Sequence, residues 1–465
     1  MNYPKTKREK VRLFDFSSGL DAKKNENLRP LSAKISFNFS LKDGSLRSGE
    51  GAEYFTVSGE PVALTASAPK KIYYYKRYDV LNGVDDDRLI LYAADGSLYE
   101  KPLFSSGGFS RVGTLSFNSP PEGVCYKLNG DDVIMFSHGE RLYVYDGTNV
   151  SDYAAPLITS MLVYNERLFV TTGGESTTLW FSENFDPTNW YVSLTEAGFI
   201  DFQDGKGKLL KMTESDGYAF VFRKYGITRI YAPFDQSEFT AVNVEADNVK
   251  IVGGVVDCGK KTIYLTDNGF CAFDGSYTSR VLTGIDALIR NVDNSGVKAA
   301  FFNGRYYAAI KISTDGKLVD VILSYDVSDG EYYFIEGVAA RDITTVFAGE
   351  DNYLLLLLDG DNRVYKLSAI SKAGDKILKK IYETPFTDFF IDGRKTLASV
   401  SLSSKKDATL IIKSDEGERR IRVFGSRGII KQTVGLKGTS FSVRVESVLP
   451  EAEISKITLE FVKSV

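Results

Sequence analysis

The sequence predicts an all-β protein whose largest part is a β-propeller of seven blades. Residues 35–66 are expected either to supply an eighth blade or to close the ring. A short phrase recurs along the chain: an apolar strand ends in Asp-Gly or an equivalent turn, and another apolar strand follows. Its landmarks lie roughly 30 to 55 residues apart, which overlaps the period of four-stranded propeller blades. The 27 Tyr and 30 Phe favour pleated, half-buried strands. Helix signal is weak, and residues 284–292 are its best candidate.

The clearest copies of the phrase mark the predicted blades. They read LILYAADG at 89–96, LYVYDG at 142–147, FCAFDG at 270–275 and LLLLLDG at 354–360. Period-two alternation beside Asp-Gly is a strong short-range hairpin signal. The alternation of residues 35–41 and the Asp43-Gly44 pair after it predict a first hairpin. We therefore place the propeller at residues 35–367.

The two ends of the chain have a different character. Residues 1–34 are polar and irregular apart from LFDFSSGL at 13–20, and are predicted to form an N-terminal extended arm. Residues 368–382 are rich in lysine and small residues and are predicted to be a linker or a short helix. The short strands after them lack the blade period, which suits a C-terminal antiparallel β-sandwich at 383–465.

Composition argues against several classes of protein. A net charge of −4 gives no sequence-wide case for nucleic-acid binding. Cys125, Cys258 and Cys271 lie in apolar strands without C-x-x-C spacing, so we expect buried, reduced thiols. We expect neither a signal peptide nor a membrane span, because the chain has no N-terminal apolar h-region and no apolar run of about 18 residues.

No group of residues suggests catalysis or a cofactor. His138 is the single histidine, which excludes a histidine metal cluster, and FSHG at 136–139 indicates a turn. The aspartates at 85–87 and 131–132 occur where turns are expected, and Asp favours turns. The paired glycines are too short to match a phosphate-binding loop. We predict no enzyme, no cofactor and no metal site.

Two places are candidates for contact between subunits. One is the N-terminal basic cluster, for which a solvated or partner-docked arm is the first interpretation and contact with phosphate the second. Its members are Lys5, Lys7, Arg8 and Lys10. The other is Trp190, which ends a polar excursion that starts after Trp180. We expect Trp180 to pack between strands and Trp190 to anchor a loop or an interface.

Several phrases, taken in order, resemble a pattern in structural proteins of tailed bacteriophages, where N-R-L-F leads to L-x-F-S and then to D-P-x-x-W. Here LYVYDGTN at 142–149 is followed by VYNERLFV at 163–170 and LWFSENFDPTNW at 179–190. ITRIYA at 227–232 and residues 253–275 are similar to the next blades of those proteins. FSSGL at 16–20 and YETPFTDFFIDGRKTL at 382–397 resemble their flanking regions. The nearest members are the tail stabilisation, or nozzle, proteins of short-tailed phages.

The resemblance implies a structural subunit of a virion tail, made in the host bacterial cytoplasm. It would form a homo-oligomeric ring below the portal and adaptor proteins, close and extend the DNA exit channel, and dock other tail parts. DNA would pass through without specific binding. The mild net negative charge of the chain would help to avoid tight binding of this DNA, and a strongly basic lumen would count against that idea. The alternatives are a receptor- or glycan-binding propeller of a phage tail and a propeller glycosidase.

Overall fold

The computed structural model describes residues 6–12, 19–22, 31–42, 44–80, 82–115, 117, 119–244, 249–426 and 428–464. Strands form nearly all regular structure in these residues; the helical elements are η2 (Gln236–Glu238), η3 (Thr283–Ile285) and α1 (Asp286–Ile289). The all-β prediction is confirmed, and α1 lies inside the segment with the best helix signal. No helix of the described residues is long and apolar enough to cross a membrane.

Four-stranded antiparallel units follow one another along most of the chain. Unit one consists of β8 (Pro69–Tyr75), β11 (Arg88–Ala93), β12 (Ser97–Pro102) and β13 (Ser110–Thr114). Unit two consists of β14 (Glu122–Leu128), β15 (Asp131–Ser137), β16 (Gly139–Tyr145) and the start of β17 (Val150–Tyr164). Unit three consists of the end of β17, β18 (Arg167–Thr172), β19 (Thr178–Phe181) and β20 (Gly198–Asp201). Unit four consists of β21 (Leu209–Ser215), β22 (Tyr218–Arg223), β23 (Gly226–Tyr231) and β24 (Thr240–Val244). Unit five consists of β25 (Ile251–Asp257), β26 (Thr262–Thr266), β27 (Gly269–Phe273) and β28 (Thr278–Arg280). Unit six consists of β29 (Lys298–Phe302), β30 (Arg305–Thr314), β31 (Lys317–Asp326) and β32 (Tyr332–Glu336).

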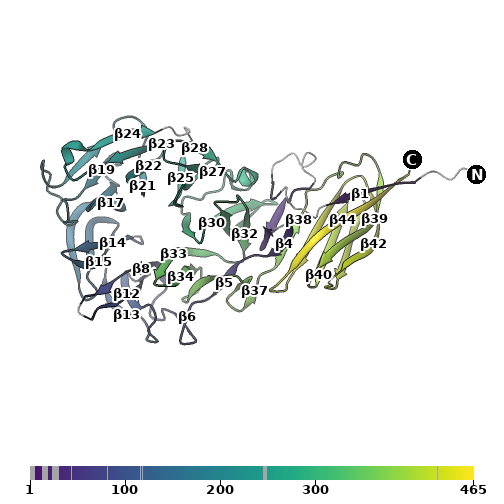
Figure 1. Cartoon of the computed structure of the whole chain (residues 1–465), viewed down its shortest axis with the longest axis horizontal. Helices are drawn as coiled ribbons and strands as arrows, with labels where there is room; N and C mark the ends of the chain where they lie inside the picture. The colour runs from purple at the N-terminus through teal and green to yellow at the C-terminus, as the bar shows by residue number, and fades with distance from the viewer. Residues whose placement is uncertain are drawn as a thin grey trace, which may run out of the picture.

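The seventh unit combines the two ends of this series. Its strands are β33 (Ala340–Ala348), β34 (Asp351–Leu358), β35 (Val364–Ser368) and β5 (Gly51–Tyr54). The early strand β5 pairs antiparallel with β35, with Ala52 opposite Leu367. The first strand of each unit lies at the centre of a ring, and β33 returns to contact β8 (Figure 1). Two small hairpins accompany the ring: β6 (Thr56–Val57) with β7 (Glu60–Pro61), and β9 (Tyr78–Asp79) with β10 (Val84–Asp85).

The remaining strands form two facing sheets at the other end of the molecule (Figure 1). One contains β1 (Thr6–Arg12), β3 (Phe39–Lys42), β4 (Ser45–Ser48), β39 (Lys395–Ser404), β42 (Ile429–Gly438) and β44 (Glu453–Ser464). The other contains β38 (Lys380–Glu383), β40 (Ala408–Ser414), β41 (Gly417–Val423) and β43 (Phe441–Ser447). Alternate residues of β44, including Ile457, Leu459 and Phe461, are fully buried in the core between the sheets. We call this part the sandwich.

The N-terminal hairpin belongs to the sandwich, so the predicted propeller boundary at residue 35 is wrong. The hairpin β3–β4 pairs with β44, and β2 (Ile35–Phe37) pairs with both β32 and β38. Unit six and half of the sandwich therefore form one nine-stranded sheet. The hairpin supplies no eighth unit, whereas β5, also within residues 35–66, completes the seventh unit by pairing with β35, which is the second role predicted for this segment. Alternation identified the strands but not their partners, because pairing depends on distant residues.

Two further boundaries also differ from the prediction. Part of the predicted arm is the strand β1, which pairs with β44. The predicted linker or helix at 368–382 contains the hairpin of β36 (Lys372–Ala373) and β37 (Lys376–Ile377), and β36 pairs with β5. The sandwich strand β38 begins within that segment as well. Most of the phrase at 13–20 lies outside the described residues.

We expect Gly51→Ala to destabilise the protein, because a Cβ at Gly51 would collide with backbone atoms of Lys372 and Ile370. Backbone on both sides is held by strand pairing, so the free energy of unfolding should fall by about 1 to 3 kcal/mol. Denaturant unfolding measures this change. Gly108→Ala is the control, since nothing lies within 4 Å of its Cβ position. Equal stability of the two variants would contradict a tight closure at β5.

Candidate interaction surfaces

Two neighbouring loops form a projecting corner on units three and four. Residues 182–197 connect β19 to β20, and residues 232–239 connect β23 to β24. Asn184 Nδ2 donates to the Phe234 oxygen at 3.1 Å, and Gln236 Nε2 donates to the Ser193 oxygen at 2.5 Å. These contacts join the loops into one surface. We call residues 182–201 and 231–240 the acidic corner.

A buried arginine holds this corner in place. Arg167, at the start of β18, is only 2% exposed, and its Nη1 donates to the backbone oxygens of Ser182 and Glu196, both at 2.7 Å. Its Nη2 donates to the Phe234 oxygen at 3.4 Å, and the guanidinium lies 5.4 Å from the centre of the Phe181 ring. Burial lowers the pKa of Arg167. Both ends of the excursion and the neighbouring loop are thus fixed to one side chain.

Sequence reasoning did not identify Arg167, although a signal was present. The residue is the arginine of the N-R-L-F phrase, and it precedes the apolar run of residues 168–170. A charged residue in a buried strand needs several hydrogen-bond partners. The backbone oxygens of Ser182, within the phrase at 179–190, and of Glu196, beyond that phrase, supply two of them, so Arg167 connects the two phrases through Ser182.

Large apolar side chains project from the corner. Leu194 is 90% exposed, Phe234 72% and Tyr191 71%, and Phe185 and Phe199 are exposed as well. Residues 182–201 hold four carboxylates and residues 231–240 hold two, and neither stretch contains a lysine or arginine. Clustered exposed apolar side chains with a polar rim are typical of interaction surfaces.

Trp190 itself lies beneath this surface. It is half-buried and packs, together with Trp180, against the apolar cluster shared by units two and three. Its Nε1 is buried and has no hydrogen-bond partner among the described residues. The contact surface beside Trp190 is therefore presented by Tyr191 and Leu194, while the indole packs inward.

The far end of the sandwich is basic. Residues 405–437 hold nine lysines and arginines against four carboxylates. Three of the lysines, Lys405, Lys406 and Lys431, pair with Glu453, Glu451 and Glu460 outside this stretch, which leaves an excess of two positive charges. Arg419 and Arg420 on β41 are exposed, and Phe424, with Arg422 5.0 Å above its ring, is 63% exposed. We call residues 405–437 the basic end. Strands β40 and β42 lie toward one end of the long axis and β19 and β24 toward the other, so the acidic corner and the basic end lie at opposite ends of the molecule (Figure 1).

The N-terminal basic cluster lies on the sandwich, away from Trp190. Arg8 and Lys10 are exposed on β1, and Arg8 Nη1 lies 3.4 Å from Glu460 Oε1. Lys7 belongs to β1, but its side chain lies outside the described residues, as does all of Lys5. The two predicted contact sites are thus at opposite ends of the molecule.

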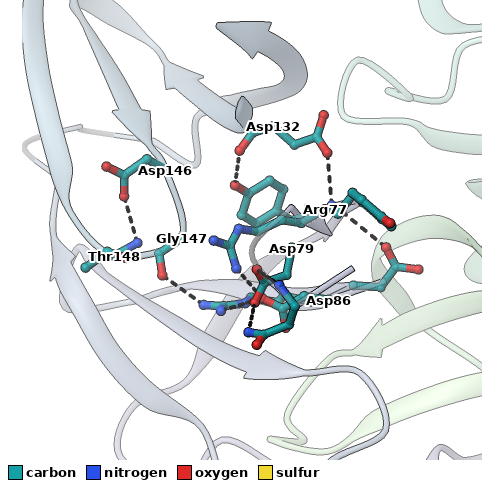
Figure 2. Close-up of polar contacts among 12 residues, drawn as sticks. Arg77, Asp79, Asp86, Asp132, Asp146, Gly147 and Thr148 are labelled. Carbon is teal, nitrogen blue, oxygen red and sulfur yellow. Dashed lines mark hydrogen bonds and ion pairs between the residues drawn. The ribbon is translucent and has the colours of Figure 1, made fainter. Parts of the chain in front are cut away.

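Asp86 and Asp132, one from each of the two groups of aspartates, lie near each other between units one and two (Figure 2). Asp86 pairs with Arg77 and, at 2.6 Å, with Arg88, and Arg88 Nη1 donates to the Gly147 oxygen at 3.0 Å. The backbone N–H of Tyr78 donates to Asp132 Oδ2 at 2.9 Å. The predicted turn role is wrong in detail, because the turns fall on neighbouring residues. Asp132 of unit two binds the backbone of Tyr78, and Asp86 is connected to unit two through Arg88.

The remaining reactive residues form no cluster. His138 lies between β15 and β16, as the turn prediction required. Cys258 and Cys271 are buried, but Cys125 is exposed on β14, so the expectation of three buried thiols is wrong for Cys125. None of the three forms a disulfide. Within the described residues, no three His, Cys, Asp or Glu side chains are placed to hold a metal ion.

No protein-family model and no curated protein matches the chain. Among solved structures, BBS1N in complex with ARL6DN has 16% identity and a TM-score of 0.44, covering 67% of this chain and 95% of its own. BamB from Moraxella catarrhalis has 12% identity and a TM-score of 0.40, covering 78% and 97%. The computationally designed Ika8 protein has 12% identity and a TM-score of 0.41, covering 69% and 100%. Similarity this low carries no argument about function.

We expect Arg167→Met to release the acidic corner. The variant loses three backbone hydrogen bonds that a charged donor makes, so the free energy of unfolding should fall by about 2 to 4 kcal/mol. Amide hydrogen exchange should accelerate in residues 183–197 before it does so elsewhere. Arg141→Met is the control, because Arg141 makes only an exposed pair with Asp152. Unchanged exchange in the excursion would contradict this role.

We expect the stability of the sandwich to depend on Glu460 in acid. Hydrogen bonds from Lys431 Nζ at 2.8 Å and Ser399 Oγ at 3.0 Å lower the pKa of Glu460 to about 2. Because this pKa is lower in the folded state than the value of about 4.3 in the unfolded chain, ionised Glu460 stabilises the fold at pH values above about 4.3. That stabilisation is lost as the pH falls from about 4.3 towards 2. Denaturant unfolding across this pH range should show that the free energy of unfolding falls less steeply with pH for Glu460→Gln than for the unsubstituted protein. The exposed Glu418→Gln should leave the slope unchanged; an equal slope in all three proteins would rule the effect out.

Proposed function

We propose that the chain is a structural subunit of a bacteriophage tail, of the nozzle or stabilisation type, and that its ring of units is a seven-bladed β-propeller. Support comes from the ordered phrases that resemble tail proteins. It also comes from the hydrogen bond that Arg167, in the phrase at 163–170, donates to the Ser182 oxygen, in the phrase at 179–190. The subunit would lie in the virion, below the portal and adaptor, around a channel through which DNA passes.

The observation that carries this proposal is the acidic corner, an exposed apolar surface with an acidic rim. Its charge is complementary to that of the basic end on the opposite side of the molecule. We infer that the corner of one copy binds the basic end of the next copy. Contact between different surfaces of identical subunits is heterologous, and it generates a ring when the rotation closes. Apolar residues such as Leu194 and Phe424 would be covered in that contact.

Light scattering and native mass spectrometry test the assembly, with the chain alone and mixed with portal and adaptor proteins from the same source. We expect a ring, and we expect Leu194→Asp in the corner and the double variant Arg419→Glu/Arg420→Glu in the basic end each to abolish it. Leu318→Asp is the matched control, because Leu318 is 66% exposed on β31, away from both surfaces. Higher salt should also weaken assembly, since the contact pairs opposite charges.

Assembly of Leu194→Asp at the level of the control would contradict the role of the corner. A persistent monomer, with and without portal and adaptor, would contradict the ring itself. The exposed rings of Phe185, Tyr191, Phe199 and Phe234 on one corner favour a receptor- or glycan-binding module as the second candidate function. A glycan array probed with the protein and with Tyr191→Ala tests that alternative.

A further inference from the structure

The centre of the ring holds a cavity of about 570 Å³. It is lined by residues at or near the starts of the first strands of several units, and by the turn between β22 and β23. Six lysines line it: Lys71, Lys208, Lys211, Lys224, Lys250 and Lys298. They come from units one, four, five and six, so residues far apart in sequence converge here.

The two carboxylates of the cavity do not balance this charge. Glu122 lies 2.9 Å from Lys71 Nζ and 2.7 Å from Lys211 Nζ. Burial raises its pKa, but the two lysines outweigh burial and hold the pKa below its ordinary value. Asp342 is buried, accepts a hydrogen bond from the Ile72 N–H at 2.9 Å, and has a raised pKa because of burial. The lining therefore keeps a net positive charge.

Lys208 and Lys224 have no carboxylate partner at salt-bridge distance among the described residues. Their backbones are fixed, because the Lys224 N–H donates to the Lys208 oxygen at 2.9 Å and the Ile251 N–H donates to the Lys224 oxygen at 2.9 Å. Fixed like charges in a concave space repel one another and focus a positive potential. Such an arrangement is unfavourable when empty and attracts anions.

We infer that this cavity binds a small, multiply charged anion of the oligophosphate class. Several ammonium groups around one space match several phosphate groups, and lysine is a common phosphate ligand. None of the residues that line the cavity is aromatic, so no ring is present for a nucleobase to stack on. The ligand is therefore recognised by its phosphate groups. The local charge is also opposite to the mild net negative charge of the chain.

Isothermal titration calorimetry with inorganic tripolyphosphate at low salt tests this site. We expect the full chain to bind it, and the double variant Lys208→Gln/Lys224→Gln to raise the Kd about tenfold or more, because two of the six charges are removed. The matched control is Lys260→Gln/Lys317→Gln, two exposed lysines outside the cavity and outside the acidic corner and the basic end, which should leave the Kd within about twofold. Equal thermal unfolding of both double variants without ligand verifies that they are folded.

Absence of binding to the unsubstituted chain, or an equal Kd for both double variants, would overturn the inference. Orthophosphate binding as tightly as tripolyphosphate would overturn its multivalent part. The site does not depend on assembly, so it can fail while the ring proposal holds, and the ring can fail while the site holds.

Discussion

The pairing of β5 with β35 is the contact on which the rest of the structure depends. It places a strand from the start of the chain at the outer edge of the last unit. Without it, β35 would expose a row of unpaired backbone groups. Closing so long a loop costs conformational entropy, which apolar packing must offset. Ala52 is fully buried in the cluster that joins units six and seven, so closure and packing occur together.

The same N-terminal segment also ties the ring to the sandwich. Phe37 on β2 packs against Phe334 of unit six, with ring centres 6.3 Å apart. The apolar core runs without interruption from units five and six into the sandwich. Ring and sandwich therefore share both backbone pairing and a core. The acidic corner and the basic end, although far apart, are carried by one continuous packed body.

The local part of this fold could be predicted from the sequence, and the long-range part could not. Alternation and Asp-Gly turns identified the strands of the units, since both signals reside in neighbouring residues. The same alternation at residues 35–41 was assigned to the propeller, although β3 and β4 pair with β44. Trp190 located the excursion, but the exposed side chains are its neighbours. Arg167 and the lysine cavity depend on residues that only folding brings together.

The nine-stranded sheet has a geometric consequence for assembly. Because β2 is hydrogen-bonded to β32 on one side and to β38 on the other, the sandwich cannot pivot on the ring without breaking strand pairing. The direction from the acidic corner to the basic end is thus a fixed vector of the subunit. In the assembly proposed above, each added copy would then turn through the same angle. A rotation that closes would give rings of one size and a rotation that does not close would give an open spiral, whereas a hinged subunit would allow rings of several sizes.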